Sequence, residues 1–227
     1  DFSVLDPELR ETIRALGLEG KSAAQVGCNN ARELLSLASL KVIPSVGIDQ
    51  SGAFLEQGRV LAKAAGLEPR LIEADIYDLP DDIGTFDLVL ITIGVLNWMP
   101  DLGGFFRVIA GLLGPGGHLL VYETHPVMEM FDPESDTPHE PAISYFRTDP
   151  LKEEGLISYD GVDHGSGETG YWFIHTLGQI VTSCATAGMT ITSLKEFGYS
   201  IREPEYDVYE GREAQIPMSY LLHARKM

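Results

Sequence analysis

The stretch Ser22-Ala23-Ala24-Gln25-Val26-Gly27-Cys28-Asn29-Asn30-Ala31-Arg32-Glu33 joins a short apolar run to a glycine turn and the start of a helical pattern. It predicts a strand over Ser22–Gly27 that leads directly into a helix over Ala31–Leu40. In open α/β sheets, ligands bind beyond the carboxyl ends of the strands, beside the point where the strand order reverses. The turn after Val26 is therefore a candidate ligand loop. The alternative is a tight turn in which Gly27 serves only the backbone angles.

Strand and helix patterns continue to alternate after this turn, which indicates a mostly parallel sheet with helices on both faces. The other predicted strands are Ser45–Asp49, Arg70–Asp75, Phe86–Gly94, His118–Thr124, Thr190–Glu196 and Met218–Ala224, and the other predicted helices are Gly52–Ala65, Leu102–Leu113 and Trp172–Gly188. A leading helix begins at Asp6-Pro7, where an N-cap acceptor precedes a proline at the first helical position. The pattern predicts one domain over residues 1–227, with seven strands.

Residues 126–170 interrupt the alternation with five prolines and scattered acidic residues. Long irregular segments in compact domains are commonly functional lids. This segment leaves the fifth predicted strand at its carboxyl end, so we expect an insertion that covers the ligand and forms the wall of a second binding site. A contact between the two copies of a homodimer is the alternative.

Composition and charge exclude several classes of protein. The chain has 34 acidic and 16 basic residues, for a net charge of −18, and a nucleic-acid partner is not expected because such binding relies on Lys and Arg. No membrane span is expected, since the longest apolar-rich run, Leu88–Met99, is too short to cross a bilayer. Residues 1–20 lack the apolar run of a signal peptide. Two cysteines make no disulfide framework, which predicts a cytoplasmic protein.

Acidic residues follow the next two predicted strands. Asp49 lies 22 residues after Gly27, which is the spacing of an acid that accepts hydrogen bonds from ribose hydroxyls. Capping of the following helix is the alternative role for Asp49. Asp75 occupies the equivalent position after the third strand, where it could bind an adenine amino group. Together, the three strand ends favour a ligand that contains a nucleoside.

The turn itself discriminates between nucleoside ligands. A dinucleotide site requires G-x-G-x-x-G spacing, because glycines let the backbone approach the pyrophosphate. Asn29 and Arg32 occupy the later positions here, and their side chains would obstruct that approach. The Asn29 amide instead suits a ligand with an amino-acid tail, so S-adenosylmethionine (SAM) is expected. An NAD-dependent dehydrogenase is the less favoured alternative.

Several blocks of the chain, in order, resemble the class I SAM-dependent methyltransferases. They are Gln25–Leu37, Val46–Asp49, Glu73–Leu79, Phe86–Trp98 and the Pro-Gly-Gly turn within Leu112–Glu123. The resemblance implies a Rossmann-like, doubly wound, seven-stranded, mostly parallel α/β sheet with an antiparallel final strand and an insertion after the fifth strand. It also implies methyl transfer from SAM to a small-molecule acceptor, with S-adenosylhomocysteine as the second product.

The resemblance extends to individual residues of the cofactor site. The implied set is Gly27, Cys28 and Asn29 in the first turn, Asp49 at the ribose, Gln50, Asp75 and Ile76 around the adenine, and Thr92 and Ile93 at the pocket wall. The commonest first motif has an acid at the position of Gln25 and glycines at those of Asn29 and Ala31. These departures leave open a second alternative, a protein that binds SAM without turnover.

Methyl transfer by in-line displacement requires few catalytic groups, because positioning the acceptor and excluding water do most of the work. A base is needed only for a protonated acceptor, and the candidates are Glu123, His125 and His175. His175 falls on the predicted helix Trp172–Gly188, about 200° around the axis from the apolar residue Phe173. A structural role is the alternative for each histidine.

Two acidic stretches carry weaker signals. The run Asp160–Glu168 lacks the paired spacing of a metal site, so no metal is expected. The stretch Glu203–Glu213 is most simply a solvated connection between the last two strands.

Overall fold

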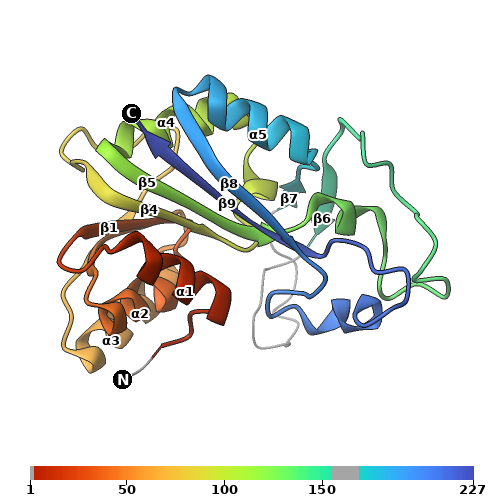
Figure 1. Cartoon of the computed structure of the whole chain (residues 1–227), viewed down its shortest axis with the longest axis horizontal. Coiled ribbons are helices and arrows are strands. Elements are labelled where there is room, and N and C mark those ends of the chain that lie inside the picture. The colour runs from red at the N-terminus through yellow and green to blue at the C-terminus, as the bar shows by residue number, and fades with distance from the viewer. Residues whose placement is uncertain (1–2, 155–168) are drawn as a thin grey trace.

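The computed structural model describes residues 3–154 and 169–227, and a seven-stranded sheet with the order β3-β2-β1-β4-β5-β9-β8 forms its centre (Figure 1). The strands are β1 (Ser22–Val26), β2 (Ile43–Asp49), β3 (Arg70–Glu73), β4 (Phe86–Thr92), β5 (Leu113–Thr124), β8 (Met189–Phe197) and β9 (Ser219–Lys226). The first five pair in parallel, whereas β9 is antiparallel to both β5 and β8. The predicted sheet and its antiparallel final strand are confirmed.

Helices cover both faces of this sheet. They are the α-helices α1 (Pro7–Leu16), α2 (Arg32–Ser36), α3 (Gly52–Ala65), α4 (Leu102–Leu112) and α5 (Leu177–Thr186), and the 3-10 helices η1 (Leu37–Leu40), η2 (Leu96–Trp98), η3 (Pro126–Met130) and η4 (Pro204–Tyr209). Figure 1 shows α1, α2 and α3 below the sheet and α4 and α5 above it. Along β4, Leu88 and Leu90 pack with the first group, and Val89 and Ile91 pack with the second. Burial on both faces explains why β4 is a continuous apolar run.

Local signals account for the helix boundaries that were predicted correctly. Helix α3 has the predicted bounds, because the Ser51 hydroxyl accepts a hydrogen bond from Phe54 N at its start and Gly66 adopts a left-handed φ of 68° at its end. The Asp6 carboxylate likewise caps α1 by accepting from Glu8 N. The predicted helix Ala31–Leu40 is divided into α2 and η1.

The predicted helix Trp172–Gly188 is wrong at its start. Thr176 and Gln179 form a capping box, in which each side chain bonds the other residue's backbone N–H, and this sets the start of α5 at Leu177. Trp172 instead ends β7 (Thr169–Trp172), an antiparallel partner of β6 (Leu151–Glu154). His175 therefore precedes the helix, and the orientation predicted for it from the helical period does not apply.

The insertion after β5 packs against the segment that precedes β9. Met128 of η3 forms a buried apolar cluster with Tyr209 and Met218, against which Phe131 and Tyr206 also pack. The run Asp160–Glu168 lies outside the described residues. Among the helices within residues 3–154 and 169–227, none has the length and hydrophobicity that a bilayer span requires.

Candidate active site

A cavity of about 1170 Å³ lies at the carboxyl ends of β1, β2 and β4. Eight of the nine predicted cofactor residues line it: Gly27, Cys28, Asn29, Asp49, Gln50, Ile76, Thr92 and Ile93. Asp75 is not in the lining, and its exposed carboxylate accepts a hydrogen bond from Tyr77 N at 2.9 Å. Because β3 ends at Glu73, Asp75 belongs to the turn that follows and not to the strand end.

The loop after β1 is held against the end of β2 by Asp49. Its Oδ2 accepts a hydrogen bond from Asn29 N at 2.6 Å, and its Oδ1 accepts one from Ser51 N at 2.9 Å. Gly27 has a φ of 61°, and a Cβ at this position would lie 2.4 Å from Cγ2 of Val95. A glycine is therefore required here both by backbone conformation and by the close approach of the loop after β4.

The residues that depart from the commonest first motif have distinctive backbone angles or hydrogen bonds. Asn29 and Ala31 have left-handed φ angles of 49° and 59°, so both occupy a conformation that glycine adopts without strain. Gln25 is buried, and its amide donates to Thr92 Oγ1 at 3.1 Å and accepts from Leu34 N at 2.9 Å. The Gln25 side chain thus ties β1 to β4 and α2, below the cavity.

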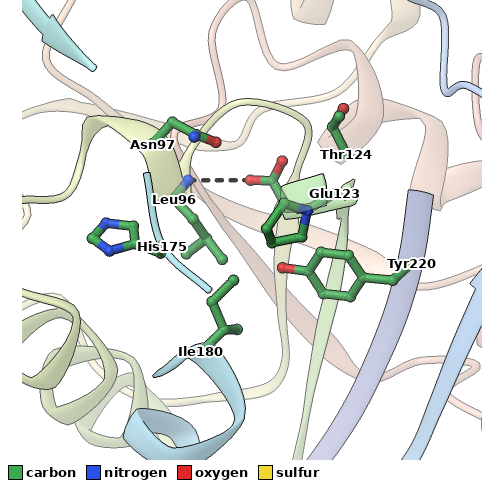
Figure 2. A pocket seen from close by; sticks show the side chains of 8 residues that line it. Leu96, Asn97, Glu123, Thr124, His175, Ile180 and Tyr220 are labelled. Atoms are coloured by element: carbon green, nitrogen blue, oxygen red, sulfur yellow. Dashed lines mark hydrogen bonds between the residues drawn. The ribbon is translucent and has the colours of Figure 1, made fainter. Parts of the chain in front are cut away.

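Glu123, the first candidate base, holds the loop that follows β4. Its buried carboxylate accepts hydrogen bonds from Gly94 N at 2.6 Å and from Leu96 N at 3.2 Å. Burial raises the pKa of this carboxyl to about 8, although the two N–H groups act in the opposite direction. Glu123 lines a small pocket of about 10 Å³ that is distinct from the large cavity. Figure 2 shows its side chain there together with those of His175 and Tyr220. Glu123 is outside the lining of the large cavity, where it would have to meet an acceptor.

The two candidate histidines make structural hydrogen bonds. His125 Nδ1 accepts from Val127 N at 3.1 Å, so its Nε2–H donates to Glu196 Oε1 at 3.0 Å. His175 Nε2 donates to the carbonyl oxygen of Met99 at 2.8 Å. Burial lowers the pKa of both rings. Neither ring lines the large cavity, so a catalytic role for them stays a prediction.

The cavity extends beyond the predicted cofactor residues to a second end, which we call the acceptor chamber. It is walled by η2, η3, η4 and β7, and its carboxylates and aromatic rings belong to Trp98, Glu129, Phe131, Asp132, Trp172, Glu203, Glu205 and Tyr206. These residues were not predicted as a site from the sequence. In the stretch Glu203–Glu213, which is expected to be a solvated connection, both Glu203 and Glu205 line the cavity; Glu203 is half-buried, whereas Glu205 is exposed as expected.

Glu203 is the half-buried carboxylate of the last pair in this lining. Its Oε2 accepts a hydrogen bond from Thr124 Oγ1 at 2.5 Å. Burial, with a smaller contribution from the neighbouring carboxylates Glu205 and Glu129, raises the pKa of its carboxyl to about 7, although the hydrogen bond from Thr124 acts in the opposite direction. A carboxyl with this pKa can accept a proton near neutral pH.

Comparison with known proteins points to the methyltransferases. Residues 24–121, which contain β1 to β4 and most of β5, match the family described as a methyltransferase domain. Over these residues the chain resembles a methyltransferase domain, as the sequence blocks predicted. The chain also resembles a demethylmenaquinone methyltransferase from Thermus thermophilus, at 42% identity over 84 residues, or 36% of each chain. The chain thus aligns with about a third of the length of that relative.

Solved structures extend the likeness of the methyltransferase domain to nearly the whole chain. A SAM-dependent methyltransferase from Methanosarcina mazei has a TM-score of 0.67 at 16% identity, with 98% of each chain covered. A glycopeptide N-methyltransferase in complex with SAM has a TM-score of 0.57 at 15% identity, with 96% of this chain and 92% of that one covered. At these identities the likeness establishes the fold, and it includes the antiparallel strands that follow the insertion.

Proposed function

We propose that this chain transfers the methyl group of SAM to a small organic acceptor. The observation that carries the proposal is a single cavity of about 1170 Å³ with two chemically different ends. This volume exceeds the roughly 300–1,000 Å³ that one drug-sized ligand occupies, so it has space for a cofactor and an acceptor together. The predicted cofactor residues line one end, and the acceptor chamber forms the other.

The residues at the cofactor end fit SAM. A carboxylate has about four lone-pair sites, and the two backbone bonds of Asp49 leave the others for ribose hydroxyls. Ile76 and Phe54 add apolar surface for a purine ring. Because Gly27 has no side chain, the loop after β1 leaves space for the cofactor. SAM supplies an electrophilic methyl group when bound, and the chain has to orient the acceptor and exclude water.

The two alternatives from the sequence are less well supported. A dinucleotide would need free N–H groups in the first turn, but Asn29 N is already bonded to Asp49. A binding protein without turnover would not require the large second chamber. The demethylmenaquinone acceptor in the name of the Thermus relative is not assigned to this chain, because that alignment covers 36% of this chain.

The two cysteines, both buried and unpaired, fit the predicted cytoplasmic location.

Titration calorimetry tests the cofactor half of the proposal. We expect saturable binding of SAM and of S-adenosylhomocysteine, and no saturable heat with NADH. An assay of S-adenosylhomocysteine release over a panel of amines, phenols, thiols and quinols then tests turnover. Binding of NADH in place of SAM would contradict the proposal, and tight SAM binding without a methylated product from any acceptor would favour the non-catalytic alternative.

We further propose that the insertion is the lid of the acceptor chamber, since Phe131, Asp132, Ile143 and Leu151 line it. Met130 O accepts a hydrogen bond from Ala142 N at 2.7 Å, so the ends of the intervening loop meet. Residues 132–141 can therefore be replaced by two glycines without a strained junction.

This replacement should expose the two tryptophans of the chain, Trp98 and Trp172, which both line the chamber. We expect their quenching constant for acrylamide to rise roughly twofold, with S-adenosylhomocysteine binding retained. Unchanged quenching, together with a dimer that becomes a monomer in light scattering, would assign the segment to a subunit interface instead.

A further inference from the structure

The acceptor chamber combines negative charge with aromatic surface. Its carboxylates are Glu129, Asp132, Glu203 and Glu205, and its rings are Trp98, Phe131, Trp172 and Tyr206. Only two basic side chains, Arg32 and Arg202, occur among the described residues that line the whole cavity. Arg202 Nη1 donates to Glu33 Oε1 at 2.7 Å on the α2 side, so its charge is compensated away from the chamber.

Hydrogen bonds to Glu129 hold the Trp172 ring in position. Trp172 Nε1 donates to Glu129 Oε2 at 2.9 Å, and Asn97 Nδ2 donates to Glu129 Oε1 at 3.3 Å. The Trp98 and Trp172 rings meet edge to face, with centroids 5.2 Å apart and an interplanar angle of 88°. Trp172 also reaches over the loop after β4, since a Cβ at Gly94 would lie 3.7 Å from its Cη2. The Trp172 ring therefore lies beside the loop after β4, next to the predicted cofactor residues Thr92 and Ile93.

The carboxylates of the chamber are close enough to perturb one another. Glu129 and Glu205 both raise the pKa of Glu203, and all three raise the pKa of the Tyr206 hydroxyl. They do not converge on one point, however, because the described residues contain no group of three or more acidic, His or Cys side chains placed to hold a metal ion. Spread-out negative charge with aromatic faces suits a bulky organic cation better than a small inorganic one.

On the basis of the proposed methyl transfer, we infer that the acceptor is an amine that enters the chamber as an organic ammonium ion. The carboxylates attract the ammonium ion, and the tryptophan pair packs on its carbon groups. For reaction, the ammonium nitrogen first loses a proton to a carboxylate of the chamber. Its lone pair then forms the new C–N bond while the C–S bond breaks and leaves its electron pair on sulfur. The products are the methylated ammonium ion and a neutral thioether, with one proton released overall.

Tryptophan fluorescence tests the inference directly, because both tryptophans of the chain line the chamber. The protein, saturated with S-adenosylhomocysteine, is titrated with benzyltrimethylammonium, benzyl alcohol or phenylacetate, which differ mainly in charge. We expect a saturable change with the cation at least about tenfold tighter than with the alcohol, and none with the carboxylate. Equal affinity for the cation and the alcohol, or no saturable change with the cation up to millimolar concentrations, overturns the inference.

Charge-removing variants locate the binding. Glu205→Gln should weaken binding of benzyltrimethylammonium about threefold, and the double variant Glu203→Gln/Glu205→Gln should weaken it about tenfold or more. Glu68→Gln removes the same charge from an exposed position outside the cavity, and we expect no effect. Full affinity in the double variant overturns the inference.

Calorimetry with S-adenosylhomocysteine on the same samples distinguishes a failure of the amine inference from a failure of the proposed function. Loss of the cation effect with intact nucleoside binding refutes the amine acceptor alone, whereas failure of the wild-type protein to bind the nucleoside refutes the proposed function.

Discussion

Replacing Asp49 with alanine is expected to weaken S-adenosylhomocysteine binding roughly a hundredfold, which corresponds to a loss of about 3 kcal/mol. If Asp49 binds the ribose as proposed, the variant loses two charge-assisted hydrogen bonds to it, and it also releases Asn29 N, which the carboxylate holds at 2.6 Å. Titration calorimetry at constant pH measures the change in dissociation constant. Asp49→Asn keeps one acceptor oxygen, so an intermediate loss is expected.

Asp75→Ala is the matched control for this experiment. The Asp75 carboxylate is exposed and is absent from the cavity lining, so its removal should change the affinity less than about threefold. If Asp75→Ala proves as damaging as Asp49→Ala, the sequence-based placement of Asp75 at the adenine is right and the cavity described above is incomplete. An unchanged dissociation constant in Asp49→Ala would remove Asp49 from the site.

Replacing Glu123 with alanine should destabilise the fold by about 2–5 kcal/mol, because the buried N–H groups of Gly94 and Leu96 both lose their acceptor. For a chain of this size, the melting temperature should fall by about 10 °C. Differential scanning calorimetry measures this, with Glu68→Ala as an exposed control. A loss of less than about 1 kcal/mol would mean that the loop after β4 does not depend on this carboxylate.

Glu123 also makes stability depend on pH in a predictable direction. Its folded-state pKa is about 8 and lies above the ordinary value for glutamate. Between pH 4.5 and 8, the folded chain therefore holds a proton at this carboxyl that the unfolded chain has lost. The contribution to stability is complete below the unfolded pKa and declines as the pH rises, by up to about 1.4 kcal/mol per pH unit.

Glu123→Gln cannot titrate, so the difference in unfolding free energy between this variant and the wild type isolates the contribution of Glu123 from that of Glu203. Measured over the same interval, the wild type should lose stability relative to the variant as the pH increases. A difference that stays constant with pH would show that Glu123 is already ionised at the acidic end of the interval.

The sequence predicted the sheet, and it named eight residues that line the cavity, because those features depend on local signals. β4 is apolar throughout since both of its faces are buried, and α3 carries its own cap residues at Ser51 and Gly66. The eight predicted residues in the cavity lining lie at or just beyond strand ends, which a parallel sheet brings together. Asp75 lies outside the lining although its neighbours Ala74 and Ile76 belong to it, because its carboxylate instead accepts a hydrogen bond from Tyr77 N.

The acceptor chamber could not be predicted because it depends on contacts between distant segments. Trp172 meets Glu129 across 43 positions of sequence, and Thr124 meets Glu203 across 79. No period or spacing in the chain relates these residues. One local signal was available: the Thr176-x-x-Gln179 capping box marks the start of α5 and would have excluded Trp172 and His175 from the helix.

The strand order has a consequence for synthesis on the ribosome. β9 lies between β5 and β8 in the sheet although it follows both in the chain. The nascent β1 to β5 can assemble as they emerge, but β8 has no hydrogen-bonding neighbour until β9 has been made. During that interval, one edge of β5 and the whole of β8 remain open to pairing with other chains. The long acidic stretch Glu203–Glu213 emerges in that same interval, and its negative charge would oppose such association between nascent chains.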